Sequence, residues 1–191
     1  MGKTPPRGRL FVLAGPSGVG KGTLRQSISD IGGLEYSVSC TTRAPRDGER
    51  DGVDYRFVTR EDFLDKVRRG LFLEYAVVHG EYYGTLRGDV ERNTAAGKDV
   101  LLEIDVQGAS SVHATKPDSV LIFVMPPSMD VLGQRLRRRG TDSEQSIATR
   151  LENAKKEVQH AAEYDHVIVN NVLEDASKEL REVILSYRRE K

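Results

Sequence analysis

The residues with the strongest chemical signal form a glycine-rich loop near the start of the chain. The loop runs Gly15-Pro16-Ser17-Gly18-Val19-Gly20-Lys21-Gly22-Thr23. Glycines let a backbone turn so that successive N–H groups point inward at phosphate oxygens. Lys21 adds a mobile positive charge that can reach the β- and γ-phosphates of a nucleotide. The whole stretch therefore predicts a loop that binds the phosphates of a nucleoside triphosphate.

The segments on either side of this loop favour the same interpretation. The apolar run Leu10–Ala14 comes directly before it and predicts a buried strand. Residues 21–31 follow it and predict a helix that Gly32 and Gly33 end. The N-terminal end of that helix adds partial positive charge for an anion. This order of strand, loop, lysine and helix favours nucleotide binding over a glycine-rich turn that holds no ligand.

One position departs from the usual form of this loop. A Ser or Thr commonly follows the lysine, where its hydroxyl can contact Mg²⁺. Here Gly22 follows Lys21, and the hydroxyl comes one residue later, at Thr23. The sequence leaves open whether Thr23, or only water and phosphate, would contact the metal.

A second group of polar side chains lies between residues 39 and 85. Arginines bind phosphate in a bidentate way, and serine and tyrosine hydroxyls can contact the same oxygens. Carboxylates repel phosphate, so Glu74 and Asp105 need a neutral donor such as the Watson–Crick edge of guanine. The alternative is that residues 39–46 form an exposed hairpin and that the two carboxylates only cap backbone groups. The polar residues of this group are Ser39, Thr41, Thr42, Arg43, Arg46, Tyr55, Tyr83 and Thr85.

Apolar runs that alternate with helical patterns must position these groups. The runs predict strands at Leu10–Ala14, 100–104, 119–124 and His166–Val169. The helical patterns cover 89–96, 110–114, Met129–Arg138, 143–164 and Leu173–Arg189. This alternation predicts an α/β fold in which helices cover both faces of a parallel sheet.

Residues 40–88 interrupt that alternation. Short β-like runs at 36–42, 55–58 and 71–78 surround a charged loop at 43–52 and a helix that Thr59 and Asp62 would cap. We expect a turn at residues 80–84, in the region that carries Tyr83 and Thr85. The segment predicts a small β-rich insert in the α/β core.

Composition excludes several classes of function. A chain of 191 residues suits one α/β domain with small inserted pieces, or at most two small domains. Lys and Arg together number 29, as do Asp and Glu, so the zero net charge argues against a general binder of nucleic acid or membrane surfaces. No apolar stretch approaches the roughly 20 residues of a membrane span. The single cysteine, Cys40, suits a reducing cytosol, and we expect a cytoplasmic protein with small-molecule partners.

Several motifs in the same order resemble guanylate kinase and extend over nearly the whole chain. Besides the loop at 15–23, they are SVSCTTRAPR at 37–46, GVDY at 52–55, FLEY at 72–75, YYGT at 82–85, EIDVQG at 103–108 and a lid, RGT, at 139–141. The resemblance implies transfer of a phosphoryl group from ATP to GMP, with Mg²⁺ bound to the ATP and with dGMP as a further acceptor. It also implies a place in purine nucleotide metabolism and GMP recycling.

The resemblance further implies a role for each matching residue. The GMP phosphate would be bound by Ser39, Arg43, Arg46 and Tyr83, with Tyr55 beside them. The guanine would be bound by Glu74, Thr85 and Asp105, with Glu103 ranked below Asp105. The catalytic cations would be Lys21, Arg43, Arg135, Arg139 and Arg150. Asn170 would join the phosphate loop as an ATP-binding residue, near the adenine.

The family's organisation implies a P-loop core of residues 1–39, 89–133 and 153–191. Residues 40–88 would form the GMP-binding insert and residues 134–152 a short helical lid. We expect both to close over the substrates, because an open site would let water accept the phosphoryl group.

Two other functions stay open. The chain could phosphorylate a different small acceptor, or it could be a non-catalytic interaction module with a guanylate kinase-like fold. Glu74 and Asp105 favour guanine, and the presence of Lys21, Arg139 and Arg150 favours an enzyme. The sequence does not decide between a monomer and a homo-oligomer, and it assigns no role to Arg137 and Arg138.

Overall fold

The computed structural model of this chain describes residues 7–140 and 143–189. Residues 1–6, 190 and 191 of the predicted core, and Thr141 and Asp142 of the predicted lid, lie outside the described residues. The chain divides into two compact units. Within the described residues, the first unit comprises 7–10, 33–102 and 110–119, and the second comprises 11–32, 103–109, 120–140 and 143–189.

A parallel sheet forms the core of the fold. In the described part of the chain its strand order is β2-β7-β1-β8-β9. In the second unit, β1 (Leu10–Ala14) pairs with β8 (Val120–Met125), and β8 pairs with β9 (His166–Val169). In the first unit, β2 (Leu34–Tyr36) pairs with β7 (Asp99–Glu103). Residues 11–14 and 122–124 are fully buried, as the apolar runs predict.

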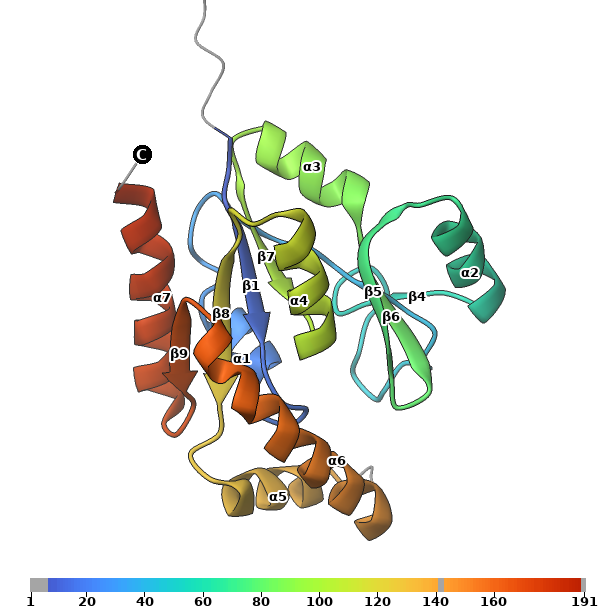
Figure 1. Cartoon of the computed structure of the whole chain (residues 1–191), viewed down its shortest axis with the longest axis vertical. Coiled ribbons are helices and arrows are strands. Elements are labelled where there is room, and N and C mark those ends of the chain that lie inside the picture. The colour runs from blue at the N-terminus through green and yellow to red at the C-terminus, as the bar shows by residue number, and fades with distance from the viewer. Residues whose placement is uncertain (1–6, 141–142, 190–191) are drawn as a thin grey trace, which may run out of the picture. The chain divides into compact units, whose positions relative to one another are not determined.

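Helices follow these strands along the chain (Figure 1). They are α1 (Lys21–Ser27), α3 (Arg87–Ala95), α4 (Val106–Thr115), α5 (Met129–Arg138), α6 (Glu144–Glu157), the 3₁₀ helix η1 (Val158–Glu163) and α7 (Leu173–Arg189). In the second unit, α7 packs against α1 and β9, and α5 packs against α6. The prediction of a parallel sheet flanked by helices is confirmed. None of the described helices combines the length and apolar character needed to cross a bilayer.

A second, smaller sheet lies within the first unit. Its order in the described residues is β4-β3-β6-β5, made by β3 (Cys40–Thr41), β4 (Arg56–Phe57), β5 (Phe72–Val78) and β6 (Glu81–Leu86). Helix α2 (Arg60–Arg68) contributes Phe63, whose ring stacks on Phe72 at 4.4 Å between centroids. Cys40 packs in the same apolar cluster as a buried free thiol, which gives this sheet its own small core.

The predicted turn at 80–84 is wrong. The turn consists of His79 and Gly80, both with positive φ (52° and 87°), and β6 begins at Glu81. This is the geometry of a tight two-residue hairpin turn, for which Gly80 gives a sequence signal and His79 gives none. Tyr83 and Thr85 therefore lie in a strand and share one face of the sheet.

Several helix boundaries also differ from the sequence patterns. Helix α1 ends at Ser27 rather than 31, because Ser27 and Ser29 donate their hydroxyls back to the carbonyls of Leu24 and Gln26. The predicted helix at 143–164 is α-helical only to Glu157 and continues as η1. Helix α4 begins at Val106 rather than 110. The cap at Thr59 is confirmed, since its hydroxyl accepts from the Asp62 N–H.

Candidate functional site

The phosphate loop owes its path to three glycines with positive φ. Gly15, Gly18 and Gly20 have φ values of 142°, 89° and 100°. A Cβ on Gly15 would lie 2.4 Å from the Val124 carbonyl oxygen, so this residue lets the loop pass close to β8. Gly20 caps the N-terminus of α1 in the left-handed conformation. The turn before α1 therefore needs glycine for both space and backbone conformation.

The side chain of Lys21 turns back and contacts the start of the phosphate loop. Its Nζ donates to the carbonyl oxygens of Gly15 at 2.6 Å and Pro16 at 3.3 Å. Burial lowers the pKa of Lys21, and the negative charges of Glu103, Glu157 and Asp105 only partly oppose that shift. A buried cation in need of anionic partners suits a phosphate site.

Two side chains that are distant in the sequence of the second unit donate hydrogen bonds to the backbone of the phosphate loop. Arg135, on α5, donates to the carbonyl oxygens of Val19 at 3.2 Å and Asn170 at 2.9 Å. The buried Asn170 donates its side-chain amide to the same Val19 oxygen at 2.8 Å. Arg135, which the resemblance makes a catalytic cation, and Asn170, which it makes an ATP-binding residue, both contact the backbone of the loop.

The other predicted lid cations differ in their surroundings. Arg150, on α6, donates to the Ser17 hydroxyl at 2.9 Å, so it too reaches the phosphate loop. Arg139 caps the end of α5, is exposed, and lies near enough to lower the pKa of Lys21. Arg137 instead forms an exposed ion pair with Glu144 at 3.0 Å. Arg135 on α5 and Arg150 on α6 therefore bring positive charge to the phosphate loop.

Glu103 lies beside the position that lacks a hydroxyl. A Cβ on Gly22 would be 3.5 Å from Glu103 Oε1, and Arg25 pairs with Glu103 Oε2 at 3.3 Å. No group of three His, Cys, Asp or Glu side chains in the described residues could hold a metal ion by itself. Magnesium usually keeps several waters and binds through few carboxylates together with substrate phosphates. The Glu103 carboxylate, which lies beside Gly22, fits such a water-rich site for Mg²⁺ that arrives with a nucleotide, whereas Thr23, one residue later, is exposed.

Asp105 occupies the N-terminus of α4. Its Oδ1 accepts from the Gly108 N–H at 2.9 Å, and Gln107 Nε2 donates to Oδ2 at 3.4 Å. This is the contact of a helix cap, the alternative that the sequence left open. Capping uses one carboxylate oxygen and leaves the other with a weak contact to Gln107.

A buried carboxylate and hydroxyl face each other in the small sheet. Glu74, on β5, is only 6% exposed, and its Oε1 accepts from the Thr85 hydroxyl, on β6, at 2.6 Å. The register of β5 against β6 shifts between Phe72 and Glu74, which brings Glu74 opposite Thr85. A bulge of this kind re-aims a side chain. The arrangement presents a buried acceptor suited to a neutral donor.

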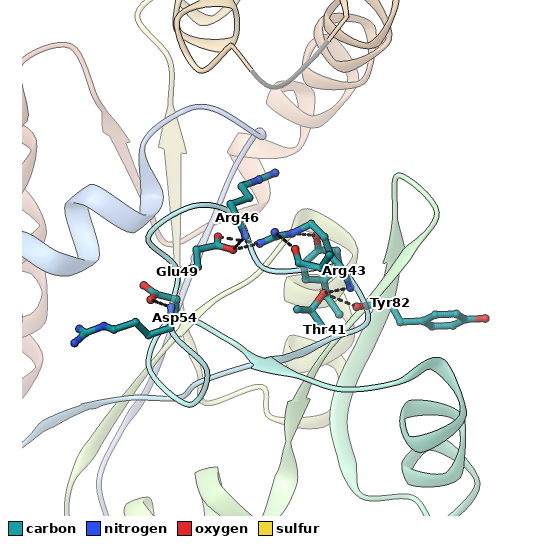
Figure 2. Close-up of polar contacts among 9 residues, drawn as sticks. Thr41, Arg43, Arg46, Glu49, Asp54 and Tyr82 are labelled. Atoms are coloured by element: carbon teal, nitrogen blue, oxygen red, sulfur yellow. Dashed lines mark hydrogen bonds and ion pairs between the residues drawn. The ribbon is translucent and has the colours of Figure 1, made fainter.

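Arg43 forms the centre of a second cluster in the same unit. Its Nε donates to the Tyr83 hydroxyl at 3.2 Å, and its Nη2 lies 2.9 Å from both carboxylate oxygens of Glu49 (Figure 2). Burial lowers the pKa of Arg43, but the hydrogen bonds that Arg43 donates to Glu49 and Tyr83 outweigh that effect and raise the pKa above its ordinary value. The guanidinium also lies over the Tyr55 ring, 5.4 Å from its centroid. Arg43 is thus a fixed cation.

Ser39 comes just before β3 and is 3% exposed, and its hydroxyl has no hydrogen-bond partner in the structure. A buried hydroxyl without a hydrogen-bond partner is unfavourable, and a ligand that bonds to it removes that cost. Cys40, the next residue, pairs with Gly84, which stands between Tyr83 and Thr85 on β6. Ser39 therefore lies on the part of the sheet that carries the Glu74 and Arg43 clusters.

Comparison with known proteins identifies the family. The family model for guanylate kinase matches residues 7–187. The chain belongs to the guanylate kinase family. It is 49% identical over 182 residues to the guanylate kinase of Symbiobacterium thermophilum, which covers 95% of this chain and 86% of that protein. It is 51% identical over 183 residues to a guanylate kinase of Thermus thermophilus, with 96% of this chain and 83% of that protein covered.

A solved structure agrees with these relatives. The crystal structure of guanylate kinase from Anaplasma phagocytophilum is similar with a TM-score of 0.77 and 37% identity, over 96% of this chain and 88% of that one. The predictions of a P-loop fold and of a nucleotide-binding kinase of the guanylate kinase family are confirmed.

The guanylate kinase site residues predicted from the sequence fall into two sets. The second unit brings together the phosphate loop, Arg135, Arg150 and Asn170. The first unit brings together Arg43, Tyr55 and Tyr83, and separately Glu74 and Thr85. The Arg46 guanidinium extends away from this cluster (Figure 2).

Sequence reasoning missed Glu49 and Arg25. Glu49 stands three residues after Arg46 across a turn, and this spacing was the available signal for its contact with the Arg46 N–H. Arg25 lies one helical turn after Lys21 and pairs with Glu103. Nothing in the sequence pointed to that long-range pair.

Proposed function

We propose that this protein transfers the γ-phosphoryl group of ATP to GMP, giving ADP and GDP, and that it also accepts dGMP. The guanylate kinase relatives support this reaction by identity over most of the chain. The reaction serves purine nucleotide metabolism and GMP recycling. Its place is the cytoplasm, a compartment that suits a chain with one buried free thiol.

The observation that carries this proposal is the placing of Tyr83 and Thr85 on β6. The two residues share one face of the strand and are about 7 Å apart along it, from the usual rise per residue. Tyr83 contacts Arg43, a fixed cation, and Thr85 contacts Glu74, a buried acceptor. One strand therefore displays a phosphate-binding cluster beside a base-binding cluster, at a spacing within the length of a nucleotide.

The acceptor nucleotide divides between these clusters. The GMP phosphate binds Arg43, Arg46 and Tyr83, with Ser39 and Tyr55 beside them. The guanine donates to Glu74, with Thr85 and Asp105 completing its contacts. Adenine lacks the N1–H and 2-amino donors that a carboxylate requires. With AMP, the buried Glu74 carboxylate would therefore face adenine N1, which is an acceptor and not a donor.

The donor nucleotide binds the loop at 15–23. The backbone N–H groups and Lys21 hold its phosphates, and Asn170 and Arg135 keep the loop in shape. Arg139 and Arg150, together with Arg135, supply positive charge for the transferring group. Phosphoryl transfer asks mainly for alignment and charge neutralisation, so no covalent phospho-enzyme and no dedicated general base is needed.

Magnesium enters with ATP. When bound, it neutralises phosphate charge and helps to align the phosphoryl group. The residue suited to its water shell is Glu103. The insert at 40–88 and the lid at 134–152 close over the substrates and keep water from the phosphoryl group.

Measuring ADP release tests this function. The protein is given ATP and Mg²⁺ with GMP, AMP, CMP or UMP, and the assay is repeated on Glu74→Gln. We expect turnover with GMP and not with AMP, and a large loss for Glu74→Gln, whose amide no longer offers two acceptors. Turnover with another acceptor would favour a different small-molecule kinase. Absence of turnover, together with absence of ATP binding, would favour a non-catalytic interaction module.

A further inference from the structure

Arg43 is held on three sides by other parts of its own unit. Besides the contacts of Nε with Tyr83 and of Nη2 with Glu49, its Nη1 donates to the Ala44 carbonyl oxygen at 2.6 Å. A guanidinium is planar and carries five N–H donors in fixed directions. Contacts at all three nitrogens therefore set both the position and the plane of this cation.

Glu49 contributes more to this arrangement than a single ion pair. One of its carboxylate oxygens also accepts from the Arg46 backbone N–H at 2.8 Å, and its own N–H donates to the Arg46 carbonyl oxygen at 3.0 Å. Figure 2 shows dashed lines from the Glu49 carboxylate to Arg43 and to the Arg46 backbone. Glu49 thus links the side chain of one phosphate-binding arginine to the main chain of the other.

The ion pair of Arg43 and Glu49 is less exposed than an ordinary surface ion pair. The side chains of Arg43 and Glu49 are 15% and 19% exposed, compared with 53% and 72% for Arg137 and Glu144. Exposed pairs contribute little because solvent screens them. A largely covered carboxylate that contacts a cation and a backbone N–H together holds its partners more firmly.

We propose that Glu49 is a positioning residue for the acceptor phosphate, acting through Arg43 and through the Arg46 backbone. This inference rests on the proposed function. A free arginine side chain loses rotamer entropy when it binds an anion, and a side chain already fixed loses less. Glu49 already restricts the Arg43 side chain in the folded protein, so that the phosphate binds an arginine that is in position.

Glu49 also carries a negative charge, so the opposite role, competition with the phosphate for Arg43, can be tested. If its main effect were to compete with the phosphate for Arg43, removing it would strengthen GMP binding. If its main effect is to position Arg43, removing it weakens GMP binding but leaves the binding of guanosine, which has no phosphate, unchanged. The sign of the change for GMP therefore decides between the two roles.

The same loop offers two matched controls. Asp54 Oδ2 accepts from the Arg50 N–H at 2.8 Å, so Asp54→Ala removes a carboxylate that holds the loop backbone at a different point. Asp47 is exposed two residues before Glu49, and Asp47→Ala removes one negative charge close by. Comparison with these variants separates positioning of Arg43 from loop stability and from net charge.

The experiment measures binding of GMP and of guanosine by calorimetry, and KM and kcat for GMP, in wild type, Glu49→Ala, Glu49→Gln and the two controls. We expect Glu49→Ala to raise the Kd and KM for GMP about tenfold, the size expected from freeing one arginine side chain. We expect kcat to change less and guanosine binding not to change. Glu49→Gln, which keeps one acceptor, should lie between wild type and Glu49→Ala.

Three results would overturn the proposal. They are tighter GMP binding in Glu49→Ala, equal weakening of GMP and guanosine, and the same loss of GMP binding in Asp54→Ala. Failure of the proposed function itself looks different, because wild type would then neither bind GMP in preference to other nucleotides nor turn it over.

Discussion

The Thr85 hydroxyl donates a 2.6 Å hydrogen bond to Glu74 Oε1 across neighbouring antiparallel strands, and both side chains are at most 6% exposed. A buried carboxylate is unfavourable unless donors surround it. Thr85 supplies one donor and holds the carboxylate in one orientation. In the proposed function the guanine donates to the same carboxylate.

Replacing Thr85 by valine keeps the shape of the side chain and removes that donor. We expect Thr85→Val to lower the free energy of unfolding by about 1–3 kcal/mol, the usual effect of leaving a buried polar group without its partner. We also expect a higher KM for GMP with little change in the KM for ATP. Chemical denaturation and steady-state kinetics measure the two effects.

Thr85→Ser is the control, because it keeps the hydroxyl. It should stay close to wild type in KM for GMP. A Thr85→Val variant with wild-type KM for GMP would contradict the role of this hydroxyl in orienting Glu74.

Two glycines of the phosphate loop should respond in opposite ways to alanine. A Cβ on Gly22 meets only ordinary contacts, 3.5 Å or more from Glu103, and Gly22 lies in α1. A Cβ on Gly18 would lie 2.7 Å from a Leu136 methyl group, and its φ is 89°. We expect Gly22→Ala to raise the free energy of unfolding by up to about 1 kcal/mol and Gly18→Ala to lower it by more than that.

Thermal or urea unfolding of both variants checks this pair of expectations. Equal destabilisation of the two would show that the glycine at 22 has a conformational role that the structure does not give it.

Arg135 should act on ATP rather than GMP. Its two contacts with the carbonyl oxygens of Val19 and Asn170 use the forked geometry of a guanidinium, which lysine lacks. We expect Arg135→Lys to raise the KM for ATP and to lower kcat, each several-fold, while the KM for GMP stays near wild type. Arg137→Lys, an equivalent change on the same helix at an exposed pair, should have little effect. A larger effect at Arg137 than at Arg135 would contradict this account.

The lowered pKa of Lys21 predicts proton uptake when ATP binds. Burial favours the neutral amine in the free protein, and the negative phosphates then favour the ammonium. The pKa of Lys21 is therefore higher in the complex than in the free protein. Proton uptake should grow, and ATP affinity should fall, as the pH rises through the pKa that Lys21 has in the free protein, which is lower than its pKa in the complex.

Calorimetric titrations in buffers with different ionisation heats, at a series of pH values below the ordinary lysine pKa of about 10.4, measure this uptake. Lys21→Met should remove its dependence on pH. Uptake that persists in Lys21→Met would assign the proton to another group.

The core of the fold was predictable because its signals are local. The strand Leu10–Ala14 and the helices Met129–Arg138 and Leu173–Arg189 have the predicted boundaries, since long apolar runs and helical periodicity depend on neighbouring residues. The turn at His79 and Gly80 was not predicted, because a histidine with positive φ gives no sequence signal. Strand β6 was consequently interpreted as a turn.

The side-chain clusters were predictable only as residue types. The pairing of Glu74 with Thr85 depends on a register shift in β5, and a register shift leaves no mark in the spacing of apolar residues. The contact of Arg135 with Val19 joins residues 116 positions apart. Such contacts follow from packing of the whole chain, which explains why Arg25 was missed, whereas the contacts of Glu49 with Arg43 and Arg46 are local in the sequence.

A labelled γ-phosphoryl group shows whether ATP and GMP exchange it directly. The protein is incubated with ATP labelled at the γ-phosphate, Mg²⁺ and GMP, and the products are separated. The account predicts that the label appears in the β-phosphate of GDP as ADP forms, with none retained on the protein. Label in inorganic phosphate, on the protein or on a different acceptor would contradict direct transfer from ATP to GMP.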